Sequence, residues 1–168
     1  MGTKNYLIEG LSGTGKTTVA EELQRRGHHV IHGDRELAYQ GDPESGEPTE
    51  TQLHEHHIWD ARKVRQLAGD QSAPATFFCG GSRNLPQFRD VFDEVFVLRV
   101  DLATLTRRLD ARPDEEWGGG KPTERSRIEQ WHRNHEDVPA GAIPIDATAP
   151  VADVVDDILR RCGTRTVR

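Results

Sequence analysis

Short apolar runs alternate along this chain with longer segments in which apolar residues recur at helical spacing. The runs lie at residues 6–8, 29–31, 75–79, 95–100 and 142–145, and each of them predicts a β-strand. The segments between these runs have room for helical crossovers, so the strands are expected to be parallel. The pattern therefore predicts an α/β fold in which a five-stranded parallel sheet carries helices on both faces.

The helices that flank the predicted sheet have recognisable ends and faces. The first helix is expected over residues 16–26, where Gly27 ends it. The last helix opens near Pro150, and its apolar face consists of Val151, Val154, Val155, Ile158 and Leu159.

Two stretches are too long and irregular to be simple connections. Residues 35–70 form an insertion between the second and third strands, with many turn-forming residues at 41–48. A helix is predicted there from about residue 52 to 67, because Leu53, Val64, Leu67 and Ala68 share one face. Residues 113–124 contain three consecutive glycines and separate two predicted helices, so we expect a mobile lid at this point.

Length and composition narrow the class of protein. The 168 residues suffice for one domain with a real core. The formal net charge is −6 at pH 7 and no block of five or more Lys and Arg residues occurs, which argues against a broad surface for nucleic acid or anionic membranes. Cys79 and Cys162 are the only cysteines and are expected to be reduced. No signal-like or membrane-spanning apolar stretch is evident, so we expect a cytoplasmic protein. We expect it to be a monomer or a homodimer.

The segment between the first strand and the first helix matches the phosphate-loop pattern GxxxxGK[ST]. Glycines let successive backbone N–H groups turn towards phosphate oxygens, and the N-terminus of the following helix adds positive potential. Lys16 is expected to reach the terminal phosphates of a nucleotide, and Thr17 to ligate Mg²⁺. The alternative is an ordinary glycine-rich turn, which the flanking strand and helix make less favourable. The expected nucleotide-binding residues are Gly10, Leu11, Ser12, Gly13, Thr14, Gly15, Lys16, Thr17 and Thr18.

Ligands of open parallel sheets bind beyond the carboxyl ends of the strands, where polar residues stand in this sequence. Asp34 follows the second strand and could hold a water of the Mg²⁺ shell or accept a proton, although Asp is also a common helix cap. Arg83 follows the third strand, directly after a glycine pair. There it can make a forked contact to phosphate or carboxylate, or it can be a surface residue that opens a helix.

Further candidates follow the fourth and fifth strands. Arg108 and Arg112 lie one helical turn apart beside a buried stripe of leucines, where they bind nucleotide or cover a packed helix. Arg125 follows the glycine-rich stretch and can move in with a lid or remain on a solvated helix face. Thr148 belongs to a loop that either lines an adenine or only opens the last helix.

Taken in chain order, these residues resemble the adenylate kinase-like group of P-loop nucleoside and nucleotide kinases, which includes shikimate, gluconate and chloramphenicol kinases. Residues 29–34 resemble the strand whose Gly-Asp carboxylate lies near the metal, and residues 80–83 the segment whose Arg contacts the substrate. Arg108 and Arg112 match the two arginines beside the lid, and residues 145–148 resemble the adenine-side loop. The resemblance implies a three-layer P-loop kinase fold that uses ATP and Mg²⁺.

The chain also departs from relatives of this kind. Leu37 stands where adenylate kinases carry an Arg for the monophosphate, and His32 stands where shikimate kinases carry a second carboxylate. Both departures argue against those two activities. The resemblance places acceptor binding in the insertion, and the expected acceptor-side residues are Asp34, Arg35, His57, Arg62, Arg83 and Arg125.

The resulting hypothesis is a kinase that transfers the γ-phosphate of ATP to a small molecule, with a nucleoside or nucleotide as the favoured acceptor. Another small alcohol, such as a sugar, a shikimate-like compound or an antibiotic, is the alternative, as is ATP hydrolysis without an acceptor. The expected metal ligands are Thr17 and Asp34, and the expected catalytic residues are Lys16, Asp34, Arg83 and Arg108. The His pairs at 54–57 and 132–135 lack companion ligands at zinc spacing and are not interpreted as a metal site.

Overall fold

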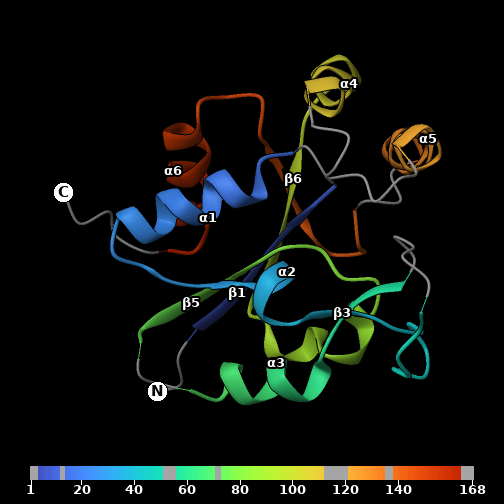
Figure 1. Ribbon diagram of the computed structural model, residues 1–168. Coiled ribbons are helices and arrows are strands. Elements are labelled where there is room, and N and C mark those ends of the chain that lie inside the picture. The colour runs from blue at the N-terminus through green and yellow to red at the C-terminus, as the bar shows by residue number, and fades with distance from the viewer. Residues whose placement is uncertain are drawn as a thin grey trace.

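The computed structural model describes residues 4–11, 14–50, 56–70, 73–111, 121–134 and 138–163. Its central sheet has five strands, all paired in parallel, in the order β2-β5-β1-β6-β7 (Figure 1). These strands are β1 (Lys4–Gly10), β2 (His29–His32), β5 (Ala75–Cys79), β6 (Glu94–Arg99) and β7 (Ile143–Asp146). The predicted five-stranded parallel sheet is confirmed, and β1, which leads into the phosphate loop, lies at its centre.

Helices cover both faces of this sheet, as predicted (Figure 1). They are α1 (Lys16–Arg25), α2 (Gly33–Glu36), α3 (Ala61–Ala68), α4 (Leu102–Ala111), α5 (Lys121–Arg133) and α6 (Val151–Arg161). Two single-turn 3₁₀ helices, η2 (Leu85–Gln87) and η3 (Arg89–Val91), follow β5. In the described part of the chain, no helix combines the length and apolarity needed to cross a bilayer.

Alternate residues of the central strands enter two separate cores. Tyr6 and Ile8 of β1 pack in the core that α1, α4 and α6 cover, whereas Leu7 packs in the core on the α3 side. Phe77 and Phe78 of β5 divide in the same way. Because both faces are buried, the strands are apolar at successive positions, which is why their sequence runs were easy to identify. The two cysteines are free thiols, as expected.

The insertion differs from its prediction. The expected helix over 52–67 is wrong at residues 57–59, which form the short strand β4 (His57–Trp59). This strand pairs antiparallel with β3 (Ala38–Gln40), and Asp60 then caps α3 by accepting a hydrogen bond from the Lys63 backbone N–H at 3.2 Å. Pairing with a strand distant in the sequence thus determines the structure at residues 57–59, although the local apolar spacing is helical. Leu53 and residues 113–120 of the predicted lid lie outside the described residues, whereas its last part, 121–124, forms the start of α5.

Candidate functional site

The phosphate loop begins where β1 ends, in a turn that allows no side chain at Gly10. A Cβ placed there would lie 2.5 Å from Thr14 Oγ1 and 2.9 Å from the Leu98 carbonyl oxygen. Thr14 is buried, and its hydroxyl donates to the Leu11 carbonyl at 2.7 Å. Gly15 has a φ of 100°, a left-handed conformation that suits glycine, and it immediately precedes α1. Ser12 and Gly13 lie outside the described residues.

Lys16 carries the cation of this loop. Its Nζ donates to the Gly10 carbonyl at 2.6 Å, and it also lies close to the turn after β5, since a Cβ on Gly81 would be 3.4 Å from it. Thr17 and Thr18 follow in the first turn of α1 and are both exposed. The ammonium group therefore lies between the phosphate loop and the segment that follows β5.

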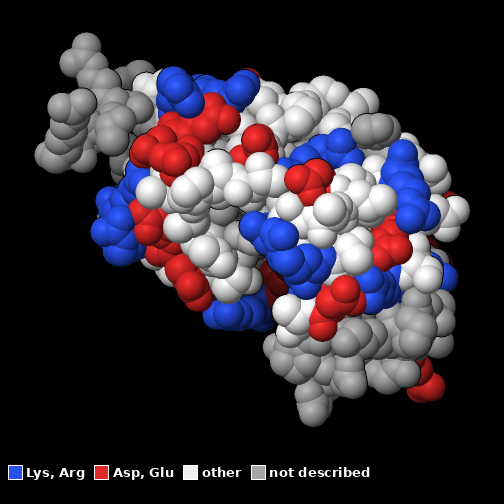
Figure 2. Space-filling model, turned by 90° about the horizontal axis from the view of Figure 1, so that it is seen from above, with Lys and Arg blue, Asp and Glu red and all other residues white. Residues whose placement is uncertain are grey.

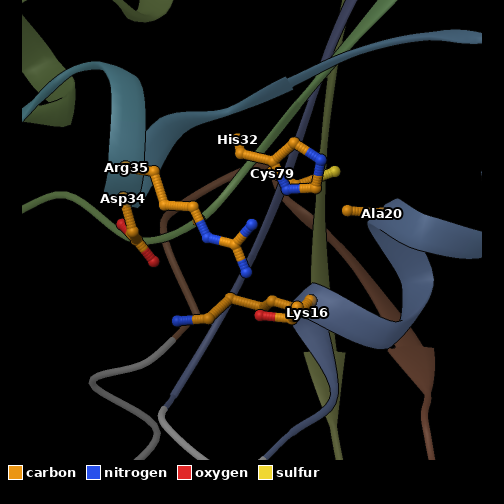
Figure 3. A pocket seen from close by; sticks show the side chains of 8 residues that line it. Lys16, Ala20, His32, Asp34, Arg35 and Cys79 are labelled. Atoms are coloured by element: carbon orange, nitrogen blue, oxygen red, sulfur yellow. The ribbon is translucent and has the colours of Figure 1, made fainter. Parts of the chain in front are cut away.

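A pocket opens beside Lys16, and Figure 3 shows its lining from close by. The side chains of Lys16, Asp34 and Arg35 extend into the same space in this view. The pocket thus combines two cations and a carboxylate from α1 and α2. Its lining residues are Lys16, Thr17, Ala20, His32, Asp34, Arg35, Cys79 and Gly80.

Asp34 is the second residue of α2, so it is not the cap of that helix. Its Oδ1 accepts hydrogen bonds from His57 Nε2 at 2.9 Å, from Trp59 Nε1 at 3.3 Å and from the Gly81 backbone N–H at 3.2 Å. Burial acts to raise the pKa of Asp34, but the His57 hydrogen bond and the charge of Lys16 outweigh it, and the pKa lies below its ordinary value. Among the described residues no hydrogen bond reaches Oδ2, so this oxygen is available to a ligand.

Two glycines make room for the indole ring that supports Asp34. A Cβ on Gly33 would lie 2.2 Å from Trp59 Cζ2, and one on Gly80 would lie 2.8 Å from the same atom and 2.7 Å from Asp34 Oδ1. Gly80 also has a φ of 145°, which other residues rarely adopt. Trp59 is fully buried and stacks on Phe88, with ring centroids 5.9 Å apart and planes 5° from parallel. Trp59 belongs to the insertion that was expected to bind the acceptor, but its support of Asp34 was not predicted from the sequence.

The segment after β5 joins the edge of β4. The side chain of Asn84 donates from Nδ2 to the Trp59 carbonyl at 2.9 Å and accepts at Oδ1 from the Trp59 backbone N–H at 3.0 Å. The Arg83 backbone N–H donates to the His57 carbonyl at 3.0 Å. These three bonds fix the position of β4, and with it the donors to Asp34.

Arg83 itself is exposed and lies over the ring of Trp131 in α5, with its guanidinium carbon 4.5 Å from the ring centroid. A guanidinium at this distance from an indole is held by a cation–π interaction. Arg83 therefore connects the end of β5 with α5, the helix that follows the predicted lid.

Glu9 is a site residue that the sequence reasoning missed. It is the residue before Gly10, is 8% exposed, and accepts at Oε1 a hydrogen bond of 3.2 Å from the Ser82 backbone N–H. Burial raises the pKa of Glu9 to about 7, although the Ser82 bond and the charge of Lys16 oppose this effect. The available signal was a charged residue between the apolar run at 6–8 and the phosphate loop.

The residues expected on the nucleotide side lie across the phosphate loop from Asp34. Arg108 Nη2 donates to the Ala147 carbonyl at 3.4 Å, and its Nη1 lies 3.9 Å from a Cβ built on Gly15. Thr148 follows in the next position, where its backbone N–H and hydroxyl both donate to Asp146 Oδ1. The structure thus brings α4, the phosphate loop and the loop after β7 together, while Arg112 lies outside the described residues.

The remaining candidates are more dispersed. Arg125 forms ion pairs with Asp110 of α4 and with Glu129 of its own helix, so it holds α5 against α4 instead of extending to the pocket. Arg62 is exposed in the first turn of α3. In the described ranges no group of three or more His, Cys, Asp or Glu residues has the arrangement of a metal site.

The charge distribution agrees with the composition. Figure 2 views the molecule from above and shows Lys and Arg side chains interspersed with Asp and Glu side chains on this face. The basic groups on this face are therefore local, and they form no continuous track of the kind that a nucleic-acid backbone requires.

The fold and the site define a P-loop α/β protein, in which a phosphate loop follows the central strand of a parallel sheet. The chain belongs to the AAA domain family, whose model matches residues 7–132. Its fold is that of the P-loop kinases of the adenylate kinase type. The resemblance to the P-loop kinases of the adenylate kinase type and the fold predicted from the sequence are both confirmed.

Solved structures with this fold include several small-molecule kinases. A shikimate kinase from Bacteroides thetaiotaomicron has a TM-score of 0.65 at 14% identity, over 95% of this chain and 98% of that one. A sugar kinase from Janibacter has a TM-score of 0.56 at 16% identity, over 98% and 96%. A deoxyadenosine kinase from M. mycoides, with bound dATP, has a TM-score of 0.50 at 16% identity, over 96% and 100%. No curated protein matches the chain.

Proposed function

We propose that this protein is an ATP- and Mg²⁺-dependent kinase that phosphorylates a small hydroxylated acceptor. One observation carries the proposal: the phosphate-loop residue Lys16 and the firmly held carboxylate of Asp34 line the same pocket at the carboxyl ends of the strands. Phosphoryl transfer depends mainly on positioning and on the neutralisation of charge, and these two groups supply both. The kinases among the structural neighbours support this assignment of the fold to phosphoryl transfer.

The residues present fit a nucleotide and its metal ion. The unengaged Oδ2 of Asp34 and the exposed hydroxyl of Thr17 are oxygen ligands of the kind that Mg²⁺ prefers, and both residues line the pocket. When bound, Mg²⁺ neutralises negative charge on the phosphates. Residues 10–18 would hold the phosphates, and Arg108, Arg112 and Thr148 would hold the remainder of the nucleotide.

The chain's own groups then have distinct roles in the transfer. Lys16 donates to the Gly10 carbonyl at 2.6 Å, and its ammonium group has further N–H donors that would bind the terminal phosphates. Arg83, in the segment after β5, and Arg108, in α4, would stabilise charge that develops during transfer. We assign the chain to one kinase domain in which residues 35–70 bind the acceptor and residues 113–124 close over it. Arg125 would have to leave Asp110 and Glu129 to take part in that closure.

A nucleoside or nucleotide is our first acceptor candidate, and Arg35, His57, Arg62 and Arg83 would contact it. A specific observation favours a second candidate, a small anionic alcohol. Trp59 is fully buried against Phe88, so this indole cannot stack on a base, whereas the arginines present charge to an anion. The shikimate kinase among the neighbours agrees with this second candidate.

A coupled assay of ADP release over nucleosides, nucleoside monophosphates, sugars and small hydroxy acids tests the proposal. One acceptor class should stimulate ADP release, and Lys16→Ala should reduce the stimulated rate by about 10² or more, since one charge-stabilising donor is lost. The matched control is Lys4→Ala, because Lys4 is an exposed lysine at the start of β1 whose Nζ pairs only weakly with Asp93, at 3.5 Å, outside the insertion. Unchanged turnover in Lys16→Ala would refute the proposed mechanism.

Binding gives a second, independent measurement. ATP with Mg²⁺ at about 100 times its dissociation constant should stabilise the folded state by roughly 2.7 kcal/mol, provided that it binds only that state. For a domain of this size the melting temperature should rise by several degrees. The absence of any shift with purine nucleotides would contradict the assignment of the phosphate loop.

A further inference from the structure

Arg35 is a second cation in the pocket beside the phosphate loop. It lines this pocket together with Lys16 and Asp34, and its guanidinium group extends into the same space as the Lys16 side chain (Figure 3). In the part of the chain that the structure describes, no hydrogen bond or ion pair engages the Arg35 side chain. Two cations that share a pocket repel each other, and an anion between them removes the repulsion.

The two acidic residues that flank Arg35 in the sequence are both engaged elsewhere. Asp34 accepts its three hydrogen bonds from β4 and from the turn after β5. Glu36 Oε2 accepts a hydrogen bond of 2.6 Å from the His32 backbone N–H. Neither carboxylate forms an ion pair with Arg35, so its positive charge is available to a ligand.

The rest of the pocket lining supplies no acidic side chain to balance Arg35. It consists of Thr17, Ala20, His32, Cys79 and Gly80. Burial raises the pKa of the Cys79 thiol to about 12, so this group is uncharged at neutral pH. One carboxylate, that of Asp34, therefore lies among two cations, and the proposed function assigns that carboxylate to the metal.

Arg35 approaches the pocket from the acceptor side of the sheet. It belongs to α2, which follows the edge strand β2 and leads directly into β3 of the insertion. The nucleotide side consists of the phosphate loop, α4 and the loop after β7, where Arg108 donates to the Ala147 carbonyl. Lys16 belongs to the phosphate loop, so the two cations of the pocket come from different sides of the site.

From this arrangement we propose that Arg35 is a specificity-determining residue that binds an anionic group of the acceptor. The acceptor is then a compound that carries a carboxylate or a phosphate close to the oxygen atom that is phosphorylated. Proximity is required because Arg35 and Lys16, which would hold the transferred phosphate, line one pocket. The inference rests on the proposed kinase function and deepens it, because it names the substrate class.

The chemistry of the guanidinium group agrees with this class. Its planar fork of N–H donors matches a carboxylate or a phosphate, to which it donates two parallel hydrogen bonds. A neutral nucleoside or sugar would leave the charge of Arg35 without a partner. Neutral acceptors are therefore expected to bind more weakly than anionic compounds of the same skeleton.

The competing explanation is that Arg35 binds the transferred phosphate itself. In that case the loss of Arg35 would lower turnover with every acceptor, whether charged or neutral, and would raise the KM for ATP. If Arg35 binds the acceptor, its loss acts on the KM for anionic acceptors and leaves the KM for ATP unchanged. The two explanations thus differ in a comparison of charged and neutral acceptors.

The experiment measures acceptor-dependent ADP release by the full chain with sets of acceptors that share a skeleton and differ in charge. The sets are nucleosides with their monophosphates, sugars with their sugar acids and sugar phosphates, and glycerol with glycerate and glycerol phosphate. The wild type should use one anionic compound with a kcat/KM at least about tenfold above that of its neutral counterpart. The second and third sets show whether the bound anion is a carboxylate or a phosphate.

Three variants test the assignment to Arg35. Arg35→Met retains an unbranched side chain without charge, and it should raise the KM for the anionic acceptor by about tenfold to a hundredfold, as expected when hydrogen bonds to a charged group are lost. Arg35→Lys retains the charge without the fork and should recover part of this loss. Arg160→Met is the matched control, because Arg160 is an exposed arginine of α6 that pairs with Asp157 and does not line the pocket.

The outcomes separate the two proposals. If the preferred acceptor is neutral, or if Arg35→Met lowers kcat/KM equally for charged and neutral acceptors, the role of Arg35 is overturned and the kinase function stands. If no acceptor stimulates ADP release by the wild type, both are overturned. The melting temperature shows whether each variant is folded, and should Arg35→Met fail to fold, an undiminished preference for the anionic compound in Arg35→Gln would equally overturn the inference.

Discussion

Replacement of Glu9 by Gln should stabilise the folded protein at neutral pH, and the size of the effect follows from the burial of the carboxyl. Burial raises the pKa of Glu9 from the ordinary 4.5 to about 7. Each unit of difference between the folded and unfolded states corresponds to about 1.4 kcal/mol, so the full effect is roughly 3 kcal/mol. Since Glu9 is only 8% exposed, solvent screening of this effect is small.

The direction of the pH dependence is fixed by the raised pKa. The folded state binds the Glu9 proton more tightly than the unfolded state does, so this contribution to stability is fully present below about pH 4.5. It is lost progressively as the pH rises to about 7 and is constant above that value. Glutamine does not ionise, so the free energy of unfolding of the variant does not decrease in this way as the pH rises.

Urea unfolding of the wild type and Glu9→Gln at a series of pH values measures the difference directly. The free energy of unfolding of the variant, minus that of the wild type, should increase by roughly 3 kcal/mol between about pH 4.5 and 8, because all other titrations are shared and cancel. Glu94→Gln is the control, because Glu94 is an exposed glutamate at the start of β6, and its difference from the wild type should not increase with pH in this way. A difference that stays flat, or that falls as the pH rises, would mean that Glu9 is ionised in the folded protein and stabilised by Lys16, which would refute the dominance of burial.

Two further predictions concern the support of Asp34. Gly80→Ala should destabilise the fold by more than the roughly 1 to 3 kcal/mol of backbone strain, because its Cβ would also meet Asp34 and Trp59. Gly27→Ala is the control for strain, since Gly27 has a φ of 88° and nothing lies within 4 Å of its Cβ position. Equal losses of stability in urea unfolding of the two variants would contradict the steric argument. Trp59→Phe removes the indole N–H that donates to Asp34 at 3.3 Å but keeps an aromatic ring against Phe88, so the pKa of Asp34 should rise. An NMR titration of the Asp34 carboxyl measures this pKa. No rise would show that the indole does not help to lower it.

The parts of the fold that the sequence predicted well are those with a strong local signal. Strands buried on both faces appear as uninterrupted apolar runs, and the five central strands were located for this reason. The insertion was predicted less well, because β4 has three residues and is stabilised by β3, about twenty positions earlier in the chain. A strand of that length has no periodicity of its own, and only its pairing partner determines its structure.

The candidate site shows the same division. The phosphate loop and Asp34 could be proposed because a motif or a position after a strand identifies them. Glu9 was overlooked because a lone glutamate beside an apolar run matches no binding motif. The groups around it, Ser82 in the segment after β5 and Lys16 in α1, are distant in the sequence. Arg125 shows the converse. Its pair with Glu129 has the i,i+4 spacing typical of a helix, but no sequence signal indicated its pair with Asp110 on another helix.

The bonds between Asn84, Arg83 and β4 have a consequence for specificity. The Asn84 side chain bonds the backbone N–H and carbonyl of Trp59, as a neighbouring strand would. The hairpin that carries His57 and the segment that carries Arg83 are therefore expected to move together as one rigid group. A hinge for closure over an acceptor must then lie outside this unit, and both side chains would approach Lys16 together. Substitutions at His57 and Arg83 should therefore be non-additive in their effects on acceptor choice, and evolution of a new acceptor preference would have to alter the pair jointly.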